Sequence, residues 1–337
     1  MILHVMPTYY CDNNCGYCYL GNLRKEYKII NKIELNSALS KVDTLIANGI
    51  LRENITHIDI YGGDIFEIPV SYLKCSIIKP LLDRYQEASV NIVGIGNDRT
   101  PFVTDLLMRD LIDEYGERIY WSVSYNKERP NNKETLQTLS MLEYQPKDAL
   151  VVLFPKNIKD PKEYLTELNA LHINHITFLQ YFPSNKNPWY MTLSYEEFNS
   201  TMIKLLHEYF SNRKDYNFEI NNINDLNDVI NGNYNVYTDE AIFINPSSQL
   251  GFIDYKEFDG NIVEYFRSFD NLDDIAIFLN QERKLYEQSC KDCIRFNHCY
   301  PEHLNKYALN NKKDNCCGRL SLINEYERLV DKYGINN

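Results

Sequence analysis

Short apolar segments rich in β-branched residues recur along the first half of the chain, and stretches with helical periodicity separate them. Strands that alternate with helices join through right-handed crossovers into a parallel sheet. Six strands are too few for a closed eight-stranded barrel. The sequence therefore predicts an α/β fold whose core is an open, TIM-like (β/α)6 partial barrel spanning residues 1–190. The predicted strands are Ile2–Met6, Ile55–Tyr61, Val90–Ile95, Arg118–Ser124, Ala149–Phe154 and His175–Phe182.

Residues typical of helix ends support this alternation. Asn36 is expected to cap a helix that stops at Gly49. Thr100 and Pro101 open a second helix that Gly116 closes, and Asp160 followed by Pro161 opens a third.

Beyond the barrel, the composition changes. Residues 191–237 are predicted to form a bridging helix, Ser194 to Phe210, followed by a linker rich in Asn, Asp and Tyr. Residues 238–337 are predicted to form a small α+β extension. Its elements are a hairpin of Ala241–Ile244 and Leu250–Ile253, a helix at Leu272–Glu287, a cysteine-rich loop at 290–317 and a C-terminal helix at 319–332.

Charge and hydropathy narrow the class of protein. The 337 residues carry 35 Lys and Arg against 47 Asp and Glu, a net charge of −12, which argues against a nucleic-acid partner. No apolar run is long enough to span a bilayer, and the N-terminus shows no secretion signal. A cytoplasmic location, without a membrane partner, is therefore expected. Thiols stay reduced there, so the nine cysteines are not expected to form a disulfide framework.

Three of these cysteines, Cys11, Cys15 and Cys18, lie in one short loop after the first predicted strand. Thiolates at this spacing can share a metal centre. A tetrahedral zinc site would need a fourth ligand, which is not evident nearby. A [4Fe–4S] cube held by three cysteines leaves one iron open for a ligand. A zinc knuckle and three unrelated thiols remain the alternatives.

The Cys-x3-Cys-x2-Cys spacing, with Tyr17 before the last cysteine and a strand before the first, resembles the radical S-adenosylmethionine (SAM) superfamily. The resemblance implies a partial barrel in which the open iron chelates SAM. It also implies reductive cleavage of SAM to a 5′-deoxyadenosyl radical that abstracts a hydrogen atom from a substrate.

The end of the second strand supports this resemblance. Gly62, Gly63 and Asp64 follow Tyr61 there, and paired glycines let a backbone approach a ligand closely. The family usually has Gly-Gly-Glu at this place, contacting the SAM amino group. Asp64 is one methylene shorter, which weakens the transfer of that contact.

Polar residues at later strand ends are further candidates for binding SAM. Asn97 follows the third strand, and alternation places Ser122 and Ser124 on one face of the fourth. Gln180 lies on the sixth strand. Arg129 is the one counterpart of the family's arginine after strand four, but its surroundings depart from the family pattern. Ordinary structural roles for these polar residues remain open.

A second cysteine group resembles the SPASM extension of radical SAM enzymes, in degenerate form. Cys290, Cys293 and Cys299 keep the family spacing, His303 replaces the next cysteine, and the preceding hairpin carries no cysteine. The resemblance implies one auxiliary [4Fe–4S] cluster instead of two. Structural zinc is the alternative, since these ligands suit it as well. Cys316, Cys317 or His303 would supply the fourth ligand, and Cys75, in a helix-like segment, is expected to be a buried structural thiol.

Enzymes with SPASM extensions mostly modify peptides, so the resemblance implies an enzyme of the oxidoreductase type that matures a ribosomally made precursor peptide by crosslinking or a related modification. It also implies a low-potential electron donor, of flavodoxin or ferredoxin type. With the barrel starting at residue 1, a separate peptide-recognition protein is expected, unless the hairpin binds the precursor. The alternatives are a radical SAM dehydrogenase, isomerase or epimerase acting on a sugar, nucleotide or amino acid, and a zinc-stabilised binding module. No catalytic acid is identified from the sequence.

Overall fold

A single ten-stranded sheet organises the computed structural model, which describes residues 1–51, 54–95, 100–129, 132–154, 158–181, 183–186, 195–233, 241–258, 261–299, 316 and 319–334. The strands follow the order β10-β9-β8-β1-β2-β3-β4-β5-β6-β7. Hydrogen-bonded ladders between the named strands do not close this sheet into a ring.

The six predicted strands are confirmed, in sequence order and parallel to one another. The predicted fold class, an open partial barrel with an α+β extension, is therefore confirmed as well. The strands are β1 (Ile2–Val5), β2 (His57–Ile60), β3 (Ser89–Gly94), β4 (Ile119–Tyr125), β5 (Asp148–Leu153) and β6 (His175–Gln180).

Four further strands extend this sheet at both ends. The short β7 (Glu219–Ile220) pairs with β6, within the segment expected to be a linker. The predicted hairpin is present as β8 (Ala241–Ile244) and β9 (Leu250–Phe258), and β9 pairs with β10 (Asn261–Ser268), which the sequence did not reveal. Because β8 pairs in parallel with β1, the extension continues the sheet of the barrel.

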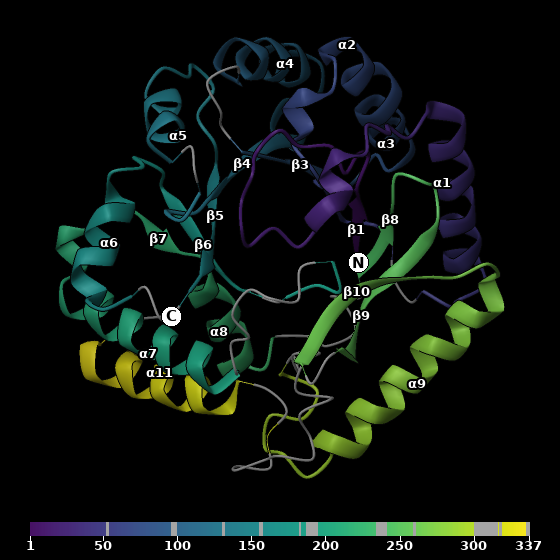
Figure 1. Cartoon of the computed structure of the whole chain (residues 1–337). Helices are drawn as coiled ribbons and strands as arrows, with labels where there is room; N and C mark the ends of the chain where they lie inside the picture. The colour runs from purple at the N-terminus through teal and green to yellow at the C-terminus, as the bar shows by residue number, and fades with distance from the viewer. Residues whose placement is uncertain are drawn as a thin grey trace.

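Helices lie around the outer, convex side of the curved sheet (Figure 1). Helix α11 packs along α7, so the C-terminal helix covers the barrel. The α-helices are α1 (Lys32–Ala47), α2 (Val70–Tyr72), α3 (Lys79–Arg84), α4 (Thr100–Tyr115), α5 (Asn132–Leu139), α6 (Pro161–Asn169), α7 (Tyr195–Ser211), α8 (Asn222–Ile230), α9 (Leu272–Cys290) and α11 (Leu320–Tyr333). Shorter turns are η1 (Gly21–Lys25), η2 (Ile65–Glu67), the π-helix η3 (Leu73–Ile78), η4 (Gly116–Arg118) and η6 (Arg213–Asp215).

The start of α1 corrects one expectation. Asn31, not Asn36, is the N-cap: its side chain accepts a hydrogen bond from the Glu34 amide, and the Glu34 side chain accepts one from the Asn31 amide. This reciprocal capping box fixes the helix start five residues earlier than predicted. Helix α4 begins at Thr100 as expected, and Asp160 caps α6 by accepting from the Lys162 amide, with Pro161 in the first turn.

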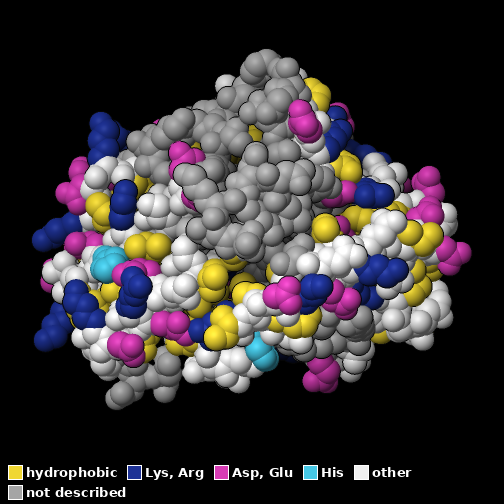
Figure 2. All heavy atoms as spheres, turned by 90° about the horizontal axis from the view of Figure 1, so that it is seen from below, with side chains coloured by type: hydrophobic (Ala, Val, Ile, Leu, Met, Phe, Trp, Pro, Cys, Tyr) yellow, Lys and Arg dark blue, Asp and Glu magenta, His cyan; other side chains and the backbone are white. Residues whose placement is uncertain are grey.

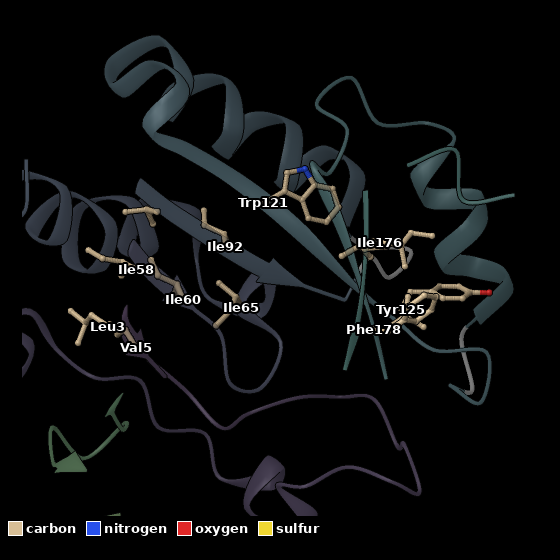
Figure 3. Packing of buried hydrophobic residues seen from close by; sticks show 14 of the residues in the cluster. Leu3, Val5, Ile58, Ile60, Ile65, Ile92, Trp121, Tyr125, Ile176 and Phe178 are labelled. Carbon is tan, nitrogen blue, oxygen red and sulfur yellow. The ribbon is translucent and has the colours of Figure 1, made fainter. Parts of the chain in front are cut away.

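The core lies between the helices and the outer face of the sheet. Ile58, Ile60 and Ile92 are fully buried there, and Trp121 fills the space beneath the helices with its indole Nε1 donating to the Tyr144 carbonyl (2.8 Å) (Figure 3). Side chains alternate across a strand, so the intervening residues point to the inner face. On β1 to β4 that inner face carries polar side chains, among them His4, Asp59 and Ser122, and it holds the candidate site.

Three further observations concern the predicted charge pattern, the absence of a membrane span and the predicted burial of Cys75. Acidic and basic side chains are interspersed over the face shown in Figure 2. No helix in the described part of the chain is long and apolar enough to cross a membrane. Cys75, expected to be buried, is exposed on η3, because Leu73, Ile77 and Ile78 form the buried side of this turn.

Candidate functional site

The loop that carries Cys11, Cys15 and Cys18 follows β1 and lies at the carboxyl ends of the parallel strands. All three thiols are partly buried. Arg24 holds the loop, since its carbonyl accepts from the Cys11 amide (3.0 Å) and its guanidinium donates to the Asn13 carbonyl (3.1 Å). The three thiols are thus presented from one anchored loop, as the sequence predicted for a shared centre.

Burial raises the pKa of the Cys11 thiol to about 12 and also raises that of Cys18, and the thiols add to each other's shift. Neutral thiols of this kind lose their protons when they bind a metal centre. In the described part of the chain, no three His, Cys, Asp or Glu side chains converge on the position of one metal ion. A four-iron cube does not require such convergence, because each thiolate ligates a different iron.

Gly62 and Gly63 bring the end of β2 against this loop. The Gly63 amide donates to the Thr8 carbonyl and the Asp64 amide to the Tyr10 carbonyl, both at 2.9 Å. A Cβ at Gly63 would lie 1.9 Å from the Tyr10 carbonyl oxygen, and one at Gly62 would lie 2.4 Å from that of Thr8. The glycines were predicted to let the backbone approach a ligand, but the close approach they make is to the cysteine loop itself.

Asp64 is fully buried at this junction and caps η2, accepting from the Phe66 amide at 3.2 Å. Burial raises the pKa of its carboxyl to about 7, and Arg129 opposes that rise. The charge of Asp64 also raises the pKa of Cys11, so carboxyl and thiol lie near each other. The structure thus places the predicted carboxylate beside the cysteine loop.

Arg129 lies closer to the cysteine loop than its surroundings in the sequence indicated. It follows β4 and is buried, with one guanidinium nitrogen donating to the Ser124 hydroxyl (3.1 Å) and another to the Ser124 carbonyl. Tyr17 and Cys15 face it and raise its pKa against the opposing effect of burial. Its Nε has no hydrogen-bond partner among the described residues. The turn Asn126–Arg129, in which the Asn126 carbonyl accepts from the Arg129 amide, sets this orientation.

The two serines of β4 share a face, as alternation predicted, but differ in depth. Ser122 is fully buried and donates to Asn91 Oδ1 (2.9 Å). Ser124 lies one pleat nearer the cysteine loop and contacts Arg129. Ser124 is therefore better placed than Ser122 to face a molecule bound at the strand ends.

Gln180 ends β6 on the same side of the strand as the core residues Ile176 and Phe178, opposite to the inner face. Neither its amide nitrogen nor its amide oxygen has a partner in the described structure, although both atoms are buried. An aromatic group lies at the same strand ends: the Tyr17 ring meets that of Phe154 at 5.2 Å, and Phe154 meets Tyr181 at 5.2 Å. Unpaired buried amide groups are costly, so they point to a missing partner. The remaining candidate, Asn97, lies outside the described residues.

A polar network lines the inner face below this level. Asp59 accepts from His57 Nε2 (3.1 Å) and from the Asn91 amide (3.0 Å), and lies 3.4 Å from His4 Nδ1. Despite the opposing effect of burial, these partners hold the pKa of Asp59 below its ordinary value. The His4 ring stacks on Phe243 of β8, with 4.4 Å between ring centroids. Sequence patterns did not single out this network, although His4, Asp59 and Asn91 occupy alternating strand positions.

The second cysteine group is only partly described. Cys290 ends α9, and its carbonyl accepts from the Cys293 amide (2.8 Å). Burial raises the pKa of Cys299 to about 12, and nearby Cys316 and Cys293 raise it further. Four of the predicted ligands therefore stand within one region. Cys317 and His303 lie outside the described residues.

Similarity of this chain to known proteins was found among solved structures. No protein-family model matches the chain, and no curated protein matches it. The solved structure of anSMEcpe with bound AdoMet aligns with a TM-score of 0.62 at 12% identity, over 99% of each chain. Streptococcus suis SuiB bound to S-adenosylmethionine aligns with a TM-score of 0.52 at 14% identity, over 93% of this chain and 75% of SuiB. SuiB bound to its precursor peptide SuiA aligns with a TM-score of 0.53 over 96% and 75% of the two chains, also at 14% identity. The chain therefore shares the fold of these proteins.

Proposed function

We propose that this chain, which has the fold of the SAM-bound proteins anSMEcpe and SuiB, is a radical SAM enzyme. The observation that carries the proposal is the junction of the cysteine loop with Gly62, Gly63 and Asp64. Beside it lies the buried Arg129, whose Nε has no hydrogen-bond partner among the described residues. The cysteine spacing and this junction are independent features of the sequence, and they meet at one end of the sheet.

The residues present fit a [4Fe–4S] cluster. Cys11, Cys15 and Cys18 supply three soft ligands from one loop, and three ligands leave one iron open. Buried thiols with raised pKa values would release their protons to solvent on ligating iron, and the cationic centre would then compensate the thiolate charge that burial disfavours. When bound, the cluster supplies the electron that cleaves SAM to methionine and a 5′-deoxyadenosyl radical.

The chain's own residues would hold SAM around that open iron. The Asp64 carboxyl is suited to accept from the SAM ammonium group, and Arg129, with its free Nε, to donate to the SAM carboxylate. Ser124 offers a further polar group at the same strand ends. Gln180 is retained as a predicted contact, although alternation along β6 puts it on the side of Ile176 and Phe178. We retain Tyr17, Gly62, Gly63, Asn97 and Ser122 as the other predicted contacts with the cofactor.

The aromatic group of Tyr17, Phe154 and Tyr181 closes one side of this region. Such a wall excludes water, which strengthens the charged contacts of the bound sulfonium ligand and protects a reactive radical. The proposed contribution of these rings to the site is their packing, and no proton transfer is assigned to the two phenols.

The second cysteine group is proposed to bind one auxiliary [4Fe–4S] cluster through Cys290, Cys293, Cys299 and Cys316 or Cys317. Soft thiol donors and the raised pKa of Cys299 support this. Anaerobically reconstituted protein should then hold about eight irons, whereas about four irons with one zinc would contradict the auxiliary cluster.

A precursor peptide is the proposed substrate, and a crosslink or a related change in that peptide the proposed product. The support is that SuiB and anSMEcpe have been solved with peptides bound, the latter with the Cp18Cys peptide at a TM-score of 0.59. A low-potential flavodoxin or ferredoxin, and a separate peptide-recognition protein, complete the proposed partners.

The decisive test is reductive cleavage of SAM by the reconstituted protein with dithionite as electron source. Wild type should release 5′-deoxyadenosine, and Cys15→Ala and Cys18→Ala should release none. Cys75→Ala is the matched control, because this thiol is exposed on η3, and should behave as wild type. Cleavage retained by Cys15→Ala or Cys18→Ala would refute the proposed function.

The substrate class has its own test, mass spectrometry of a short peptide encoded beside the gene and co-expressed with the protein. Loss of about two hydrogens would indicate a crosslink or dehydrogenation, because one bond forms between two carbon or heteroatom centres. An unchanged peptide alongside active SAM cleavage would contradict the peptide assignment and leave the radical SAM assignment standing.

A further inference from the structure

Glu264 on β10 is a carboxylic acid that the proposed cofactor sites do not use. Its backbone is fixed on both sides, because its amide donates to the Pro183 carbonyl (2.8 Å) and its carbonyl accepts from the Asn185 amide (3.0 Å). These bonds form an isolated bridge between β10 and the segment that follows β6. Glu264 thus lies where the two ends of the sheet meet at the strand ends.

The side chain of Glu264 points to the inner face of the sheet. Cross-strand partners share a face, and Glu264 pairs with Tyr255, whereas its neighbour Tyr265 pairs with Asp254. The Asp254 side is the outer one, since Phe252 on that face packs against Phe278 of α9. Glu264 therefore lies on the same face as the candidate cofactor site.

The two carboxyl groups of this hairpin differ in their partners. Asp254 accepts from the Tyr265 hydroxyl (2.9 Å) and from Arg267 (3.0 Å), as a structural carboxylate should. The carboxyl group of Glu264 has no hydrogen bond or ion pair to the described residues, although the side chain is partly buried. An enclosed acid without a cation or donor is costly to keep ionised, and a structural role does not repay that cost.

Among the described residues, the phenols of Tyr19 and Tyr61 lie near enough to Glu264 for its charge to raise their pKa. Tyr19 follows the third cysteine of the loop and its hydroxyl reaches the Gly62 carbonyl (3.4 Å), and Tyr61 precedes Gly62. Burial raises the pKa of both phenols well above the ordinary value, and the charge of Glu264 adds to it. Both phenols stay protonated near neutral pH, so Glu264 is the group here that can exchange a proton. Burial raises the pKa of Glu264 to about 7, which favours that exchange.

We propose that Glu264 is the acid–base residue that exchanges a proton with the substrate held between the cysteine loop and the β9–β10 hairpin. This proposal rests on the proposed function. The step is a proton transfer: a substrate heteroatom–hydrogen or carbon–hydrogen bond breaks, the proton goes to a carboxylate oxygen of Glu264, and the electron pair remains on the substrate.

The first experiment needs no substrate. Infrared difference spectra of the reconstituted protein between pH 6 and pH 8 should show a carboxyl group losing its proton in wild type, a signal diminished in Glu264→Gln. Glu257→Gln, at an exposed position on the same hairpin, is the control and should match wild type. Equal signals from Glu264→Gln and wild type would overturn the proposal.

The second experiment uses the co-expressed peptide and counts modified peptide per 5′-deoxyadenosine released. Loss of the acid–base group should lower this ratio in Glu264→Gln by about a hundredfold or more, with partial recovery in Glu264→Asp. Modification by wild type should rise with pH through about 7, and the residual activity of Glu264→Gln should not. An unchanged ratio would refute the role of Glu264, whereas no 5′-deoxyadenosine from wild type would instead refute the proposed function.

Discussion

The position of the cysteine loop depends on two residues that have no side chain. Gly62 has a φ of 144°, outside the range that other residues adopt readily, and Gly63 lies directly against the Tyr10 carbonyl. The backbone bonds from this turn to Thr8 and Tyr10 require that proximity. The glycine pair therefore permits the close contact between two segments of the same chain.

Gly63→Ala should abolish retention of the first cluster. The added methyl would lie 1.9 Å from a backbone oxygen that cannot rotate away, so the loop must move, at a cost above about 2 kcal/mol. Iron content and SAM cleavage measure the effect. The control is Gly49→Ala, at a φ of 67° with open space around it, which should cost about 1 kcal/mol in unfolding free energy and leave the iron content unchanged. Full iron content in Gly63→Ala would contradict this account of the turn.

Asp59 should make stability depend on pH in a defined direction. Its pKa is lowered in the folded protein from the ordinary value of 3.8 by His57 and His4, despite burial. A lowered folded pKa means that the ionised carboxylate stabilises the fold above pH 4, and that this contribution is lost as pH falls through the folded pKa.

Asp59→Asn should therefore lower the unfolding free energy near neutral pH, and the difference from wild type should shrink below pH 4. Denaturant titrations at several pH values test this. Asp83→Asn, an exposed site, serves as the reference, with no change expected. A difference from wild type that grows on acidification would mean that Asp59 is not the stabilising anion.

Features of helices and strands that depend on neighbouring residues can be predicted from the sequence. Caps made by neighbouring residues, such as Asp160 with Lys162, are complete in the sequence and were predicted. Alternation placed Ser122 and Ser124 on one face for the same reason. For α1 the sequence analysis predicted Asn36 as the cap, whereas the reciprocal hydrogen bonds with Glu34 make Asn31 the cap.

Asn31→Ala should lower the unfolding free energy by about 1 kcal/mol, because it removes the hydrogen bond to the Glu34 amide. Asn36→Ala should be neutral or slightly stabilising, since alanine is the better residue inside a helix. Chemical denaturation of the two variants compares them directly. The reverse order of effects would restore Asn36 as the start of the helix.

Other elements depend on partners distant in sequence, and these the sequence could not reveal. Strand β10 carries Glu264 on its inner face and Arg267 on the face that meets α9, so it lacks the apolar alternation that predicts a strand. The role of Arg129 depends on Cys15 and Tyr17, more than a hundred residues earlier. The exposure of Cys75 follows from the burial of Leu73, Ile77 and Ile78 on the other side of the same turn. The sequence alone therefore predicts neither β10, nor the position of Arg129 beside the cysteine loop, nor the exposure of Cys75.

At the scale of the whole molecule, the extension and the barrel share one sheet. Strand β8 pairs with the full length of β1, and Ile242, Ile244 and Leu250 are buried in the same core as Leu3 and Val5. Burial of each such side chain contributes about 1.5–3 kcal/mol. Together these contributions approach the total stability of a typical protein, about 5–15 kcal/mol.

A chain cut after residue 237 should therefore fail to fold, although it contains all six strands of the predicted barrel. It exposes β1 as an apolar edge, which favours aggregation. The full chain should unfold in one cooperative transition, with circular dichroism and tryptophan fluorescence coinciding. A chain ending at Gly334 is the control and should match it. A soluble fragment 1–237 with a cooperative transition would instead show that residues 1–190 form an independent domain, as the composition of the sequence first suggested.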